Sequence, residues 1–256
     1  MMFKNPFIKQ NLKINTNFDR VYCISYCRNI EKQNNIRKVM NYLGIDFTFI
    51  YGADYSNLEI LKHKDFNFFG GDVDDNWKSD ELFQNYTHFI GASYDHYTAI
   101  IHAYESGANS VLILEDDCTF INDISYIQWA FNNYPKDADL IKFGCVSRRS
   151  FKTFNCEGID LDKSHQFIRI PDDQYNIAFV GSQLYGIYNR KTIEKYINIQ
   201  KNNFTCVDNV PRLIENSIQY GLIYPLGIDY WGNWQDLNDN YSDIYTLFRK
   251  PYEDKF

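Results

Sequence analysis

Three consecutive carboxylates follow a wholly apolar run in this chain. Residues 111–114 read Val-Leu-Ile-Leu, and Glu115, Asp116 and Asp117 come directly after them. Four branched residues in succession are typical of a strand buried on both faces, and ligands bind at the carboxyl ends of strands in open parallel sheets. Because adjacent acids repel one another, they favour an outside cation, and a divalent ion held by carboxylates commonly also holds phosphates. The triplet is consistent with nucleotide or nucleotide-sugar chemistry, and equally with a surface turn whose acids are solvated.

A helix is expected just before this strand. Tyr97, Ile100, Ile101 and Tyr104 have the i, i+3, i+4, i+7 spacing of one helix face, and Gly107 is placed to end the helix. A helix, a tight turn and a buried strand thus precede the acids. This order favours a ligand-binding site over a solvated turn.

This order of motifs resembles glycosyltransferase family 25, which includes bacterial lipooligosaccharide sugar transferases and collagen galactosyltransferases. The family has a glycine and a Ser-His pair in a helix, then a hydrophobic strand that ends in Glu-Asp-Asp; residues 88–96 and 105–117 follow this pattern. Asp95 stands where the family usually has the serine before His96. Residues 21–25 with Arg28, and residues 181–188 with residues 207–209, resemble further family segments, so the resemblance covers residues 21–209.

The resemblance implies a GT-A-like fold and a role in lipopolysaccharide or other glycan biosynthesis. It implies transfer of galactose or glucose from a UDP-sugar to a hydroxyl of a glycan, lipid-linked or protein acceptor, with inversion at the anomeric carbon. Manganese is the metal that the resemblance favours, and magnesium suits oxygen ligands equally well.

The three acids are expected to divide their roles. In extended backbone, Glu115 and Asp117 face the same side and Asp116 faces the other. We predict Asp117 as the metal ligand, with Glu115 either near the ribose or in the water shell of the metal. Asp116 is a further donor-binding candidate, and it exchanges roles with either neighbour if the strand ends in a turn.

Direct displacement at the sugar also needs a base for the acceptor hydroxyl. Asp208 is our candidate, because it matches the family's later aspartate; alternatively it caps the helix that carries Pro211. Ser25, Arg28 and Asp54 are further candidates for donor binding. Arg28 either reaches the diphosphate or pairs with a surface acid.

The acceptor is expected near Trp231 and Trp234, whose indole rings can stack on a sugar or pack over the sheet edge. A further metal ligand near the C-terminus would be Asp229 or Asp236, although solvated loop acids are the preferred interpretation of both. For His96 a hydrogen-bonded structural role is preferred over that of a ligand.

Strand and helix patterns alternate along the chain. Strands are expected at residues 21–25, 47–51, 111–114, 140–143, 179–188 and 223–226. Helices are expected around residues 36–43, 97–104, 127–134, 193–197 and 210–218, and residues 57–85 are expected to be loop. This alternation predicts an α/β fold with a mostly parallel twisted sheet flanked by helices. One domain is expected over residues 1–256, with its core at about residues 20–230 and a polar tail after Tyr241.

Composition limits the partners. The net charge of −7 over 256 residues argues against a nucleic acid or an anionic membrane as the main partner. No apolar stretch approaches the ~20 residues of a membrane span, and residues 1–13 are too polar for a secretion signal. The expected location is cytoplasmic, with membrane contact only through the acceptor. The six cysteines form no Cys-x-x-Cys pair and are expected to be reduced.

Two other functions remain open at this point. A carbohydrate-binding or nucleotide-sugar-binding module could keep the fold without turnover. A metal-dependent nucleotidyl or phosphoryl transferase could use the same acids. The chain has no Gly-x-x-x-x-Gly-Lys phosphate cradle, which weighs against that last class.

Overall fold

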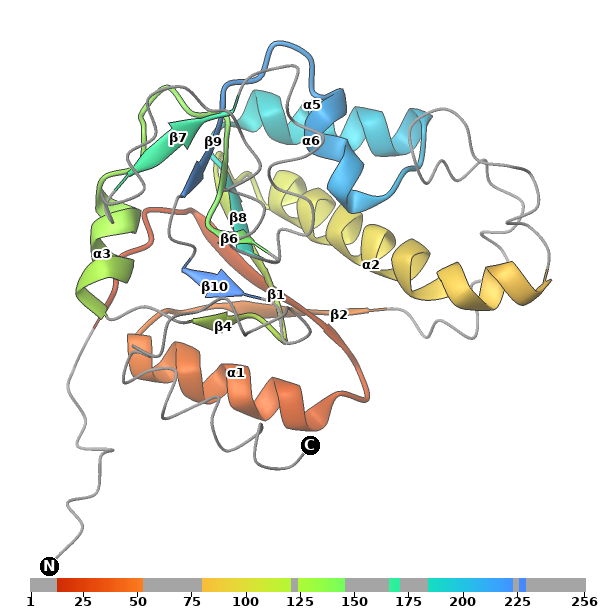
Figure 1. Ribbon diagram of the computed structural model, residues 1–256, viewed down its shortest axis with the longest axis horizontal. Helices are drawn as coiled ribbons and strands as arrows, with labels where there is room; N and C mark the ends of the chain where they lie inside the picture. The colour runs from red at the N-terminus through yellow and green to blue at the C-terminus, as the bar shows by residue number, and fades with distance from the viewer. Residues whose placement is uncertain are drawn as a thin grey trace, which may run out of the picture.

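The computed structural model describes residues 13–52, 80–120, 124–145, 166–170, 184–222 and 226–228 (Figure 1). In chain order the elements are β1 (Arg20–Tyr26), α1 (Ile30–Leu43), β2 (Thr48–Gly52), α2 (Asp80–Glu105), β3 (Val111–Glu115), β4 (Thr119–Phe120), α3 (Ile124–Asn132), β5 (Leu140–Lys142), β6 (Gly144–Cys145), β7 (Phe167–Arg169), β8 (Leu184–Ile187), α5 (Arg190–Asn202), the 3₁₀ turn η4 (Val207–Asn209), α6 (Val210–Leu213), β9 (Gln219–Leu222) and β10 (Gly227–Ile228).

Seven of the described strands form a mixed sheet in the order β2-β1-β3-β8-β5-β9-β7. β1 is parallel to β2 and β3, and β5 is parallel to β9. β8 runs antiparallel between β3 and β5, and β7 is antiparallel to β9. The predicted α/β class is therefore confirmed, whereas the prediction of a mostly parallel sheet is wrong. A smaller sheet contains β4, β10 and β6.

The antiparallel direction of β8 agrees with the sequence before it. Parallel neighbours need a crossover connection, usually a helix, and the sequence of residues 144–169 carries no helical pattern. Leu184 pairs with Leu114, and Ile187 pairs with Val111. β8 thus starts beside the carboxyl end of β3, and its first residues reach the edge of the sheet where the acids lie.

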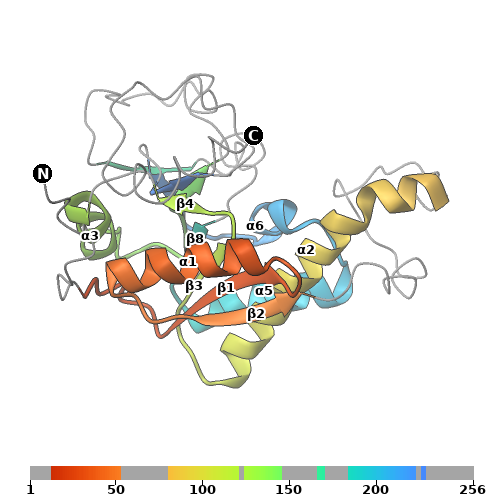
Figure 2. The same ribbon diagram turned by 90° about the horizontal axis from the view of Figure 1, so that it is seen from below.

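Helices cover both faces of the sheet (Figures 1 and 2). On one face α1 and α3 pack against Leu112 and Leu114 of β3. On the other face α2 and α5 pack against Val111 and Ile113 of the same strand. In Figure 2 the molecule is seen from the face that α1 covers, and α1 lies in front of the strands. Burial on both faces explains why β3 reads as an uninterrupted apolar run.

Element ends follow the sequence signals at some positions and not at others. Gly44 and Gly107 have φ of 65° and 77°, and they follow α1 and α2 as expected. The long helix predicted over residues 210–218 is wrong, since α6 has only four residues. The chain turns at Asn216, whose φ is 54°, and the Ile218 amide then donates to Asp139 Oδ2 at 2.8 Å. Asp139 thus directs the chain into β9.

α2 is longer than predicted, because it begins at Asp80 inside the segment expected to be loop. No helix in the described part of the chain is long and apolar enough to cross a membrane. Cys23, Cys27, Cys118 and Cys206 are free thiols. The tail after Tyr241 lies outside the described residues.

Candidate functional site

The acidic triplet divides between the two faces of the sheet. β3 ends at Glu115, and the chain then turns, with the Cys118 amide donating to the Glu115 carbonyl at 3.1 Å. Glu115 contacts α2, whereas Asp116 and Asp117 contact β1 and α1. The prediction that Glu115 and Asp117 share a side is therefore wrong, because extended backbone ends at Glu115. Asp116 and Asp117, rather than Glu115 and Asp117, share a side.

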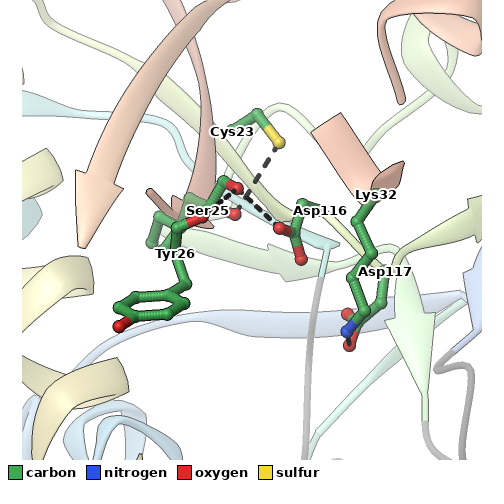
Figure 3. A network of polar contacts seen from close by, with 7 residues as sticks. Cys23, Ser25, Tyr26, Lys32, Asp116 and Asp117 are labelled. Carbon is green, nitrogen blue, oxygen red and sulfur yellow. Dashed lines mark hydrogen bonds and ion pairs between the residues drawn. The ribbon is translucent and has the colours of Figure 1, made fainter. Parts of the chain in front are cut away.

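Asp116 is held against the end of β1 (Figure 3). The Ser25 hydroxyl donates to Asp116 Oδ2 at 2.6 Å, and the Asp116 amide donates to the Ile24 carbonyl at 2.9 Å. Both side chains are buried. Burial raises the pKa of the Asp116 carboxyl, and the charge of Asp117 adds to this, while the hydrogen bond from Ser25 and the charge of Lys32 lower it. The site thus concentrates negative charge in a poorly solvated place.

Asp117 is paired with the first turn of α1. Lys32 Nζ lies 3.0 Å from Asp117 Oδ2, and the Asp117 side chain is only 13% exposed. Figure 3 shows the two side chains next to each other, beside the contact between Ser25 and Asp116. The ammonium of Lys32 thus places a positive charge beside the carboxylate of Asp117.

The donor chemistry of Asp116 and Asp117 fits a divalent ion. Both offer hard carboxylate oxygens on the same side of the sheet, and magnesium is commonly held by one or two carboxylates together with phosphate oxygens of a substrate. Among the residues that the structure describes, no three or more histidine, cysteine or acidic side chains are grouped so that they could hold a metal ion. Two carboxylates would leave most ligand positions of such an ion to other groups.

Glu115 belongs to a different network on the α2 face. Its Oε1 lies 3.1 Å from Nε2 of His96, and Nδ1 of His96 lies 2.9 Å from the Tyr185 hydroxyl. Burial lowers the pKa of His96 to about 4, against the opposing charges of Asp208 and Asp95. The imidazole is therefore neutral at pH 7, and its contact with Glu115 is a hydrogen bond rather than an ion pair. His96 is buried and hydrogen-bonded, as the sequence suggested.

Two charged groups lie close to this network. Lys142 is buried in β5, in register with Tyr185 of β8. Burial lowers the pKa of Lys142 to about 8, and the negative charge of Asp208 counteracts that shift. Asp208 lies inside η4, whose capping position is taken by Cys206. Its charge also acts on His96 and Tyr185.

Asp95, the departure from the family pattern, packs over the end of β2. A Cβ placed on Gly52 would collide with the Asp95 carboxylate. The absence of a side chain at Gly52 therefore lets α2 approach the carboxyl edge of the sheet closely.

The structure thus brings five predicted residues to one edge of the sheet: Ser25, Glu115, Asp116, Asp117 and Asp208. Arg28 is exposed in the turn between β1 and α1, so it lies near the same edge. The other predicted site residues lie outside the described residues: Asp54, Asp229, Trp231, Trp234 and Asp236.

Sequence reasoning missed Lys32, Lys142 and Tyr185. The signal for Lys142 was present, because this lysine interrupts the apolar run Leu140-Ile141-Lys142-Phe143. A lysine is almost never fully buried unless it is paired. A lysine inside a predicted buried strand therefore indicates an acid nearby.

Fold and site define an α/β protein with an acid-lined edge at the carboxyl ends of its parallel strands. No protein-family model matches the chain, and no curated protein matches it. The resemblance to glycosyltransferase family 25 therefore stays a prediction from its motifs.

Proposed function

We propose that the chain is a metal-dependent nucleotide-sugar transferase with a GT-A-like fold. In this proposal it moves galactose or glucose from a UDP-sugar to a hydroxyl of a glycan, lipid-linked or protein acceptor. The observation that carries the proposal is the acid pair Asp116–Asp117, which lies between the carboxyl ends of β1 and β3 and the first turn of α1. Ligands bind at this edge in α/β sheets.

The surroundings of the acid pair suit a diphosphate. Asp116 and Asp117 would hold manganese or magnesium, which supplies stabilisation of the charge that develops on the departing phosphate oxygens. Arg28 lies just before α1 and Lys32 lies in its first turn, so both can neutralise phosphate charge at this edge through charge-assisted hydrogen bonds. Glu115, on the other face, is left to accept a hydrogen bond from the ribose.

The acceptor side of the reaction is assigned to Asp208. The acceptor oxygen forms a bond to the anomeric carbon as the bond from that carbon to the phosphate oxygen breaks, and UDP leaves. The hydroxyl proton passes to the Asp208 carboxylate. A single displacement of this kind inverts the configuration at the anomeric carbon. Asp208 is half-buried near His96 and Lys142, which is a suitable place for a base shielded from bulk water.

One observation favours a second candidate, a nucleotide-sugar-binding module without turnover. The charge of Asp208 acts on the buried ammonium of Lys142. Asp208 can therefore serve as the counter-charge of Lys142 rather than as a base, and the module would then bind a donor and release it unchanged.

The proposal is tested by a donor screen and one pair of variants. Wild-type protein is incubated with manganese and UDP-, GDP- or CMP-sugars, and release of UDP from one of them is the expected result. In calorimetry, manganese should strengthen UDP binding to the wild type but not to Asp117→Ala. Asp46→Ala is the matched control, because it removes an exposed aspartate just before β2, at the opposite end of the sheet. Unchanged manganese-dependent binding of UDP by Asp117→Ala would place the metal elsewhere.

A further inference from the structure

A chain of two hydrogen bonds runs from the protein interior to the exposed edge of the sheet. It joins Tyr185 of β8, His96 of α2 and Glu115 of β3, at 2.9 Å and 3.1 Å. The rings of His96 and Tyr185 are stacked, with centroids 5.6 Å apart. Tyr185 and His96 are almost completely buried, whereas the Glu115 side chain is 29% exposed. Of these three side chains, only Glu115 is exposed to a ligand.

The chemistry of the three groups fixes the direction of both hydrogen bonds. An ionised carboxylate only accepts hydrogen bonds, so the proton of the His96 ring must lie on Nε2 to reach Glu115. In a neutral imidazole the other nitrogen is then an acceptor. The Tyr185 hydroxyl can donate to that nitrogen, and by doing so it stabilises the tautomer that Glu115 requires.

We propose that His96 and Tyr185 are positioning residues for Glu115. Tyr185 holds the proton of His96 on Nε2, and His96 then holds the Glu115 carboxylate toward a hydroxyl of the bound nucleotide. The identity of that ligand rests on the proposed function, while the positioning of Glu115 does not. The triplet thus serves two purposes: Asp116 and Asp117 bind the cation on the α1 face, and Glu115 recognises a hydroxyl on the α2 face.

The same helix contains a matched control pair. The Tyr22 hydroxyl lies 2.7 Å from Nδ1 of His102, six residues after His96 along α2, and the rings meet edge to face. The two hydrogen bonds of His96 go to Tyr185 and Glu115, and neither involves Tyr22 or His102. Tyr22→Phe therefore removes a hydroxyl from an equally buried tyrosine and leaves the hydrogen bonds among Tyr185, His96 and Glu115 in place.

The test combines a spectroscopic and a binding measurement. Two-bond ¹H–¹⁵N spectra of ¹⁵N-histidine-labelled protein report which ring nitrogen carries the proton, and His96→Gln identifies the signals of His96. UDP binding is measured by calorimetry in manganese chloride. We expect His96 to be protonated on Nε2 in the wild type. Tyr185→Phe should lose this single tautomer and bind UDP about 10- to 100-fold more weakly, the usual cost of removing a group that orients a ligand-binding side chain.

Tyr22→Phe should retain both the His96 tautomer and the wild-type affinity for UDP. His96→Gln, whose amide can donate to Glu115 and accept from Tyr185, should bind UDP more tightly than His96→Leu, which can do neither. The inference is overturned if His96 carries its proton on Nδ1 in the wild type, or if Tyr185→Phe binds UDP as the wild type does. If the wild type fails to bind UDP, the proposed function fails, and the tautomers in wild type and Tyr185→Phe still decide whether the pair positions Glu115.

Discussion

Replacement of Lys142 by methionine should change how stability depends on pH. Lys142 is 2% exposed in β5, and burial lowers its pKa from 10.5 to about 8 in the folded protein. In the unfolded chain the same ammonium is solvated and keeps its ordinary pKa. Below about pH 8 both states are protonated, and the cost of burying the charge is fully present. Above pH 10.5 both states are neutral, and this cost is gone.

Between these limits the unfolded state binds more protons than the folded state, so Lys142 makes the protein more stable as the pH rises. One pH unit of pKa difference corresponds to about 1.4 kcal/mol, and the interval from about 8 to 10.5 therefore corresponds to about 3 kcal/mol of unfolding free energy. Buried groups with raised pKa values act in the opposite direction in this range: Cys23, Tyr185 and Cys206 resist losing their protons, because burial disfavours their charged forms. The pH profile of wild-type stability therefore combines opposing contributions from these groups and from Lys142.

The difference between wild type and Lys142→Met isolates the lysine. Urea unfolding, followed by far-ultraviolet circular dichroism from pH 7 to pH 10, should show the wild type gaining about 2–3 kcal/mol relative to Lys142→Met across pH 8 to 10. Lys191→Met, at an exposed position in α5, is the control and should run parallel to the wild type. Parallel profiles for Lys142→Met and the wild type would refute the argument that burial depresses this pKa.

Two other substitutions test the site and the core. Asp208→Asn should preserve UDP-sugar binding and lower sugar transfer by ~10²–10⁴-fold, because a base is needed only when the acceptor attacks; transfer at the wild-type rate would remove Asp208 from the reaction and leave it as the counter-charge of Lys142. Gly186→Ala should lower the unfolding free energy by ~1–3 kcal/mol, because the added methyl collides with the Phe18 ring, which is already packed against Phe131 and Phe143. A wild-type melting temperature would show that Phe18 can move aside.

Local patterns predicted elements well where burial and an end signal coincided. α1 combines buried positions at Ile36, Val39, Met40 and Leu43 with a left-handed Gly44, and both its face and its end were readable. The last helix was predicted too long, because other hydrogen bonds replace helical ones after α6: the Gln219 side chain donates to the nearby Pro211 carbonyl, and the Ile218 amide donates to Asp139. Asp139 is distant in the sequence, and a contact of that kind leaves no periodic signal in the local sequence.

The sequence predicted at which edge of the sheet the site lies, but not which side chains the acids contact. Acids at the end of a buried strand indicated where Glu115, Asp116 and Asp117 would lie, since strand ends and sheet edges follow from the pattern. The partners of these acids come from α1, α2 and β8, and their identity depends on the strand order and on the antiparallel direction of β8. Lys32 and Tyr185 therefore could not be assigned before the topology was known.

The division of the triplet shows why one residue of backbone geometry matters for function. Had extended backbone continued to Asp117, its carboxylate would have joined Glu115 near His96, and the α1 face would have kept Asp116 alone. Because β3 ends at Glu115, two adjacent carboxylates instead lie beside Ser25 and Lys32. Two acids on one side offer a divalent cation more carboxylate oxygens than one acid does, and such a cation can also bind a diphosphate. The same turn leaves Glu115 with a neutral histidine, which orients a carboxylate without neutralising it. In the function that we propose, a single strand end thus provides a pair of acids for a cation and a separate acid for a hydroxyl from three consecutive residues.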